Sequence, residues 1–121
     1  MADRSDHLVA IVDDDDAVLD SLRFLLEVAG ARVATYHSAS DYLADAEVRP
    51  DCLILDQHMP DMTGLELVER LRADGVQLRV MLITGLNSPP LRGQAAALGV
   101  TKVLEKPPAE QELLEFIAGP G

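Results

Sequence analysis

Polar side chains able to do chemistry follow short apolar runs at four places. They are Asp13-Asp14-Asp15-Asp16 after Leu8–Val12, Asp56 after Cys52–Leu55, Thr84 at the end of Val80–Thr84, and Glu105-Lys106-Pro107 after Val100–Leu104. If these runs are parallel strands, their carboxyl ends meet at one edge of a sheet, where such sheets bind ligands. Carboxylates from two strands would repel each other there by a few kcal/mol at an effective dielectric of about 20. A bound cation would relieve that repulsion.

The ligand types at this edge favour one kind of cation. Carboxylate oxygens with room for water and a phosphate oxygen suit Mg²⁺ or Mn²⁺, whereas Zn²⁺ prefers Cys and His ligands that this edge lacks as a set. A carboxylate beside such a cation can attack a phosphoryl group and become an aspartyl phosphate. We therefore take Asp56 as a candidate nucleophile. Lys106 would pair with this carboxylate or a phosphate oxygen, and Thr84 would donate a hydrogen bond to the phosphate.

Each of these residues also has a plain structural interpretation. Acids at a helix start are favoured by the helix dipole, and we prefer this interpretation for Asp15 and Asp16. We do not prefer it for Asp13 and Asp14, which directly follow an apolar run. Taken singly, Thr84 is as often a packing residue, and a lysine such as Lys106 is more often a surface cation. The candidate site therefore depends on the whole set.

A fifth short apolar run, Arg32–Tyr36, completes a set of five predicted strands. The segments between these runs have helical spacing and helix boundary signals. Gly30 and Gly75 follow two of them, Pro50 ends another, and Gly93 weakens the fourth by about 1 kcal/mol relative to Ala. We expect this fourth helix to be short or mobile. The predicted helices are Val18–Ala29, a segment capped at Ser38-Ala39-Ser40-Asp41 that runs through Leu43 to Ala46, Leu65–Leu71, a segment after Pro89-Pro90, and Ala109–Ile117 before Gly119-Pro120-Gly121.

Alternating strands and helices predict an α/β fold, a parallel sheet covered by helices on both faces. The most apolar runs, around Ile11, Ile54 and Ile83, should form its centre. A length of 121 residues allows one domain with its own core. We expect a single domain over residues 1–121 without an output domain in this chain.

Composition excludes several function classes. A net charge of -11 argues against nucleic-acid binding and favours a cation or a basic protein partner. The single Cys52 cannot form an internal disulfide, as expected in a reducing cytosol. No apolar stretch approaches the roughly 20 residues of a membrane span, and the start MADRSDH lacks the order of a signal peptide. We expect a soluble, cytoplasmic protein with no membrane partner.

Four longer stretches resemble a known family. IVDDDDAVLDSL, LILDQHMPDMTGLELVERL, MLITG and VLEKPP are similar to the CheY-like receiver domain of two-component response regulators, in particular the FixJ type. The resemblance implies a flavodoxin-like (βα)5 three-layer sandwich with strand order 2-1-3-4-5. It also implies that Asp56 is the phosphoacceptor, helped by Thr84 and Lys106. Mg²⁺ would be held by Asp13, Asp14, Asp56 and the backbone carbonyl of His58.

The function implied by this resemblance is signalling. The domain would take a phosphoryl group from a histidine kinase or phosphotransfer protein and then promote its own dephosphorylation. It would catalyse only these two steps and would not be a dedicated enzyme. Phosphorylation would switch its contacts with an unidentified downstream protein or output domain, and the domain would be a monomer or a phosphorylation-dependent dimer.

The sequence departs from the family at two positions. Val103 stands where the family usually has a Phe or Tyr that rotates as the Thr moves, and Val has no ring to rotate. We hypothesise that signalling relies instead on Thr84 and the helix after Pro89-Pro90. Leu86, two residues after Thr84, would place an apolar group beside the phosphate. We therefore expect slow dephosphorylation.

Two other function classes remain open. In a haloacid-dehalogenase-like phosphatase, VDDDDAV would supply Asp13 as the nucleophile and Asp15 as the acid, but Asp56 and MPDMTG would have no role. In a receiver-like interaction module that no longer takes phosphate, the site residues would be vestigial.

Overall fold

The computed structural model describes residues 7–45 and 48–119. Its strands are Leu8–Val12 (β1), Arg32–Tyr36 (β2), Cys52–Asp56 (β3), Arg79–Thr84 (β4) and Lys102–Glu105 (β5). Its helices are Asp16–Val28 (α1), Ala39–Ala44 (α2), Gly64–Ala73 (α3), Pro89–Ala97 (α4) and Glu110–Ala118 (α5). None of these helices has the length and apolar character needed to cross a bilayer.

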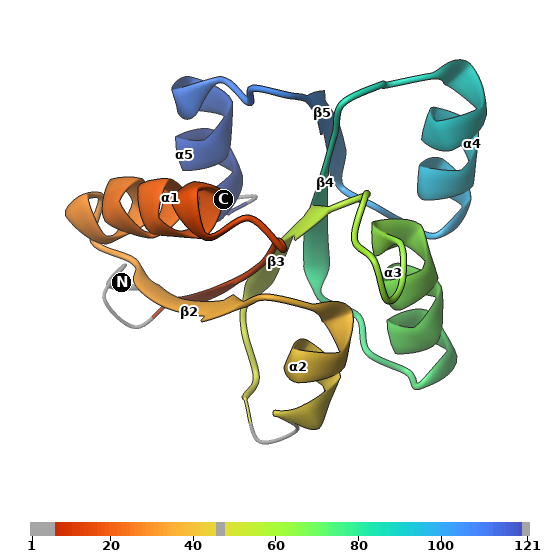
Figure 1. Cartoon of the computed structure of the whole chain (residues 1–121), viewed down its shortest axis with the longest axis horizontal. Helices are drawn as coiled ribbons and strands as arrows, with labels where there is room; N and C mark the ends of the chain where they lie inside the picture. The colour runs from red at the N-terminus through yellow and green to blue at the C-terminus, as the bar shows by residue number, and fades with distance from the viewer. Residues whose placement is uncertain (1–6, 46–47, 120–121) are drawn as a thin grey trace.

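The strands form one parallel sheet in the order β2-β1-β3-β4-β5. Helices α1 and α5 cover one face, and α2, α3 and α4 cover the other (Figure 1). This confirms the predicted α/β fold, its strand order and the central place of the three most apolar runs. The carboxyl ends of β1, β3 and β4 lie side by side at one edge.

Side chains of the central strands alternate between two separate cores. In β1, Val9 and Ile11 pack toward α1 and α5, whereas Ala10 and Val12 pack toward α2, α3 and α4. Every one of these side chains is nearly inaccessible to solvent. Burial on both faces explains why the central strands are continuous apolar runs and not alternating ones.

Helix α1 begins two residues before the predicted start at Val18. The carboxylate of Asp15 accepts hydrogen bonds from the backbone N–H groups of Ala17 and Val18 and so caps the helix. Asp16 is already in the first turn, where a negative charge is favoured.

Strand β5 begins at Lys102, so the prediction that it starts at Val100 is wrong. The N–H of Val100 donates to the carbonyl of Ala95 in α4, and Gly99 has φ +74°. A glycine in this left-handed conformation commonly ends a helix by returning N–H groups to its last turn. Val100 therefore completes the end of α4, and its apolar character reflects packing there.

The remaining boundaries differ little from the prediction. Strand β3 extends to Asp56, and β4 begins one residue earlier than expected, at Arg79. Helix α2 is capped by Ser38 and ends at Ala44, while Ala46 lies outside the described residues, as do Pro120 and Gly121. Helix α4 is short, as expected, with nine residues and Pro89 and Pro90 in its first turn.

Candidate functional site

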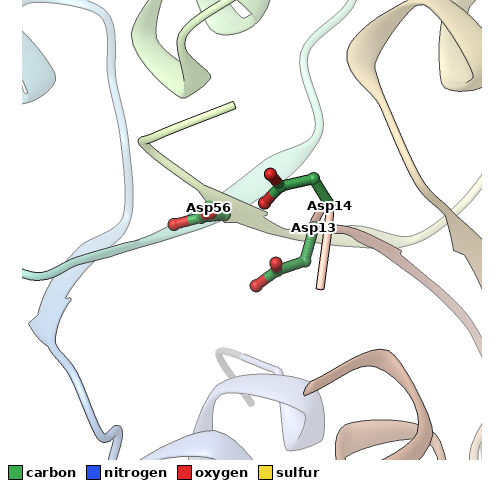
Figure 2. A group of neighbouring side chains, drawn as sticks. All are labelled: Asp13, Asp14 and Asp56. Atoms are coloured by element: carbon green, nitrogen blue, oxygen red, sulfur yellow. The ribbon is translucent and has the colours of Figure 1, made fainter. Parts of the chain in front are cut away.

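Three carboxylates gather at the carboxyl edge of the sheet. Asp13 and Asp14 directly follow β1 and Asp56 ends β3, and ligand oxygens of the three lie within 4.8 Å of one another. Figure 2 shows their side chains turned toward a common space. Asp13 and Asp56 are buried, with 5% and 3% of their surface exposed, whereas Asp14 is exposed.

The run of four aspartates divides into two pairs with different surroundings. Asp15 caps α1, and the carboxylate of Asp16 lies 2.7 Å from Nδ1 of His37, away from the cluster. The carboxylate of Asp13 accepts the backbone N–H of Asp15 at 2.9 Å. This bond turns the chain into the helix and fixes Asp13 at the sheet edge.

Lys106 is the cation nearest to the buried carboxylate of Asp56. Its Nζ lies 2.9 Å from Oδ1 of Asp56, at a distance but not an angle suited to a hydrogen bond. We therefore describe the contact as an ion pair. Burial alone would lower the pKa of Lys106, but contact with Asp56 and the charges of Asp13 and Asp14 outweigh it and raise the pKa. Lys106 stays protonated at neutral pH.

Asp13 resists ionisation. Burial raises the pKa of its carboxyl to about 6, and the nearby charges of Asp56 and Asp14 add to the effect. The N–H of Asp15 and the charge of Lys106 oppose it without cancelling it. The raised pKa of Asp13 thus reflects burial beside other carboxylates, which the charge of Lys106 does not offset.

These residues fit a divalent cation. Apart from its ion pair with Lys106, Oδ1 of Asp56 has no hydrogen-bond partner among the described residues, which is costly for a buried oxygen. Three carboxylates within reach of one another offer the hard oxygen ligands that Mg²⁺ prefers.

The hydroxyl of Thr84 is occupied in this structure. Thr84 is fully buried at the end of β4, donates its hydroxyl hydrogen to the carbonyl of Leu86 and accepts the N–H of Leu86, both at 3.2 Å. The next N–H, that of Asn87, donates to the side chain of Glu105. Sequence reasoning placed Thr84 at this edge but had no signal for its bonds to the following loop.

The junction between β3 and α3 is a part of the site that sequence reasoning missed. The carbonyl of Gln57 accepts the N–H of Gly64, and its side-chain oxygen accepts the N–H of Leu65. Thr63 and Glu66 form a capping box at the same helix start, and the pattern T-x-x-E predicts such a box. Nothing in the sequence marks Gln57 itself.

Three other residues singled out from the sequence lie outside the buried cluster of carboxylates. His58 is exposed in the loop after Asp56. Val103 is half-buried and packs against the core on the α3 and α4 face. Leu86 is 69% exposed and so turns largely to solvent.

Comparison with known proteins gives a consistent result. The family model described as "Response regulator receiver domain" matches residues 9–118. Transcriptional regulatory protein FixJ of Azorhizobium caulinodans is 45% identical over 101 residues, 82% of this chain and 47% of the relative. Response regulator protein TodT of Pseudomonas putida strain F1 is 37% identical over 118 residues, 97% of this chain and 52% of the relative. The chain thus spans about half the length of these relatives.

Solved structures agree with the sequence relatives. The crystal structure of FixJ-N superposes with a TM-score of 0.84 at 35% identity, over 93% of this chain and 91% of that one.

Proposed function

The chain belongs to the response regulator receiver domain family, and from this premise we propose that it accepts a phosphoryl group on Asp56 in a Mg²⁺- or Mn²⁺-dependent reaction. The donor would be a histidine kinase or a phosphotransfer protein. The observation that carries the proposal is the buried Asp56 carboxylate, grouped with Asp13 and Asp14 and 2.9 Å from Lys106.

The chemistry is a substitution at phosphorus. A carboxylate oxygen of Asp56 attacks a phosphohistidine, the O–P bond forms, the P–N bond breaks, and the leaving imidazole keeps the electron pair and takes a proton. Mg²⁺ held by Asp13, Asp14, Asp56 and the carbonyl of His58 would neutralise charge on the transferred group. Lys106 would then pair with a phosphoryl oxygen. The chain would catalyse only this transfer and the later hydrolysis of the aspartyl phosphate, in which water attacks phosphorus, the bond to Asp56 breaks and inorganic phosphate leaves.

The phosphatase alternative is less well supported by the geometry. It needs the Asp15 carboxylate as an acid beside an Asp13 nucleophile, but Asp15 is used to cap α1. It also gives no catalytic role to Asp56, although this buried carboxylate lies with Asp13 and Asp14.

A phosphate mimic tests the proposal without a kinase. Mg²⁺ and beryllofluoride together should raise the melting temperature of the protein, by the equivalent of about 2.7 kcal/mol at 100 times the dissociation constant. Asp56→Asn should be more stable than the wild type without ligands, because one buried charge is gone, yet should gain nothing from the pair. A wild-type protein that fails to bind the pair would support the vestigial interaction module.

An apolar hollow beside the site suits a protein donor. It has a volume of about 750 Å³ and lies between α1 and α5, with Phe24, Val28 and Leu113 among its lining residues. Phe24 and Val28 are 72% and 71% exposed. Asp13 and Lys106 line the same hollow, so a protein docked there would lie beside Asp56. We therefore assign this face to the phosphoryl donor.

Phe24→Ser separates this docking role from the chemistry. Phosphotransfer from the donor kinase should slow by about 10-fold or more, as expected for loss of an aromatic anchor. Labelling by acetyl phosphate, which needs no docking surface, should keep its wild-type rate. Both rates can be followed by intact mass spectrometry, and equal slowing of the two would contradict the assignment. Phosphotransfer profiling against histidine kinases would identify that donor.

The output step would use the loop after Thr84. For its hydroxyl to reach a phosphoryl oxygen, Thr84 must release Leu86, and this release would free the loop that leads to α4. With Val103 in place of an aromatic ring, we propose that this release is the switch. Adding beryllofluoride and Mg²⁺ should shift the amide resonances of residues 85–99, and unchanged shifts there would contradict it.

The proposed function also includes the extent of the domain, its location in the cell and its downstream contacts. We propose that residues 1–121 act as one receiver domain in the cytoplasm, consistent with the buried free thiol of Cys52. Phosphorylation would alter contacts with a downstream protein or output domain, or the assembly of the domain from monomer to dimer.

A further inference from the structure

Gln57 joins the candidate phosphoacceptor to two neighbouring elements. Its N–H donates to the carbonyl of Ile83 in β4 at 2.9 Å, and its carbonyl accepts the N–H of Gly64 at 3.0 Å. Its side-chain oxygen accepts the N–H of Leu65 at 2.9 Å. One residue thus connects the end of β3 with β4 and with the first turn of α3.

The side-chain bond is unusual for a helix start. The first N–H groups of a helix lack partners within it and are usually capped from the adjoining residues. In α3, Thr63 caps only the N–H of Glu66, while Leu65 is capped by Gln57, eight residues earlier in the chain. The helix start is therefore held by the residue that follows Asp56.

Close packing at the same point makes this connection stiff. A Cβ added at Gly64 would lie 2.7 Å from the carbonyl oxygen of Asp56 and 3.1 Å from Cα of Gln57. Glycine lets the helix start approach the strand end this closely. Any movement of Gln57 is thus limited by α3 on one side and by β4 on the other.

We propose that Gln57 is a positioning residue for the phosphorylation site. Its side-chain bond to Leu65 fixes the backbone between Asp56 and His58, and so holds the Asp56 carboxylate and the His58 carbonyl in the arrangement that a divalent cation needs. This inference rests on the proposed function. Groups that orient metal ligands typically affect metal affinity by about 10–100-fold.

Three variants separate positioning from helix capping. Gln57→Leu removes the side-chain acceptor at similar size, Gln57→Glu retains it, and Thr63→Ala removes a different cap from the same helix turn. All are measured at a temperature where each protein is folded, by calorimetric titration with Mg²⁺ in the presence of beryllofluoride and by melting temperature. We expect Gln57→Leu to weaken binding by about 10-fold or more. Gln57→Glu should bind at least as tightly as the wild type.

Thr63→Ala is the matched control. It should lower the melting temperature as Gln57→Leu does, but keep Mg²⁺ and beryllofluoride affinity within about 2-fold of the wild type, since the hydroxyl of Thr63 bonds to the N–H of Glu66 and not to the residues around Asp56. Wild-type affinity in Gln57→Leu would overturn the inference, and so would equal losses in Gln57→Leu and Thr63→Ala. A wild-type protein that binds neither ligand would instead overturn the proposed function.

Discussion

Asp13→Asn should make the metal-free protein more stable at pH 7, by about 3 kcal/mol. The reason is that burial raises the pKa of Asp13 to about 6 from an ordinary value of 3.8. At pH 7 this carboxyl is mostly ionised in the folded chain although burial disfavours its charge, and Asn removes that cost. Asn keeps the oxygen that accepts the N–H of Asp15 and carries no charge for burial to disfavour.

The stability gained by Asp13→Asn should depend on pH. Because the folded-state pKa is raised, the contribution of Asp13 is fully favourable below about pH 4 and is lost as the pH rises through about 6. The stability difference between Asp13→Asn and wild type should grow over this window and then level off. Urea unfolding at several pH values measures it, and a difference independent of pH would contradict the account.

The same substitution that stabilises the metal-free protein should weaken its binding of Mg²⁺. Asp13→Asn should lose at least about 10-fold in Mg²⁺ affinity, because a carboxylate ligand is replaced by a neutral amide. Asp15→Asn is the matched control, with the same change of charge in the same run of acids. Since Asn caps helices as well as Asp does, its stability should stay within about 0.5 kcal/mol of wild type and its Mg²⁺ affinity should be unchanged.

Gly64→Ala should destabilise the fold by about 1–3 kcal/mol, the usual cost of overpacking. Its Cβ would lie 2.6 Å from Cδ1 of Leu82, a side chain that can move, but also 2.7 Å from the backbone oxygen of Asp56, which cannot. Helix α3 would have to move away from β3. Because that movement begins at Asp56, Mg²⁺ affinity should fall as well.

Gly93→Ala is the matched control for Gly64→Ala, because an added Cβ meets no neighbouring side chain or strand at this position. No atom lies within 4 Å of a Cβ at this position in α4, so Ala should stabilise the protein by about 0.5–1 kcal/mol through its better helix propensity. Denaturant midpoints for the two variants, at equal slopes, should shift in opposite directions. Equal shifts would show that the close approach at Gly64 has no energetic consequence.

The fold was largely predictable because its signals are local. Short apolar runs indicated every strand, helical spacing indicated every helix, and the buried central strands followed from their composition. The error at Val100 had a physical cause, since a residue that closes a helix and one that opens a strand can both be apolar. The positive φ of Gly99 shows that Val100 belongs to the end of the helix, and this backbone angle cannot be read from the sequence.

The proximity of the candidate residues was predictable, but their arrangement was not. Strand ends brought Asp13, Asp14, Asp56 and Lys106 together as expected. Which of the two adjacent acids is buried depends on how α1 leaves the sheet. The partners of Thr84 and Gln57 depend on loop geometry, because both bond to backbone groups that any residue would offer.

Locating the phosphoryl group on the chain tests the central claim most directly. After incubation with acetyl phosphate and Mg²⁺, borohydride reduces an aspartyl phosphate to homoserine, a stable mark. Trypsin cleaves after Arg and Lys but not before a proline such as Pro50, so Asp56 falls in the fragment 33–70 and the run of four acids in the fragment 5–23. Tandem mass spectrometry should find homoserine at position 56, dependent on Mg²⁺. Homoserine at position 13, or none in either fragment, would contradict the account.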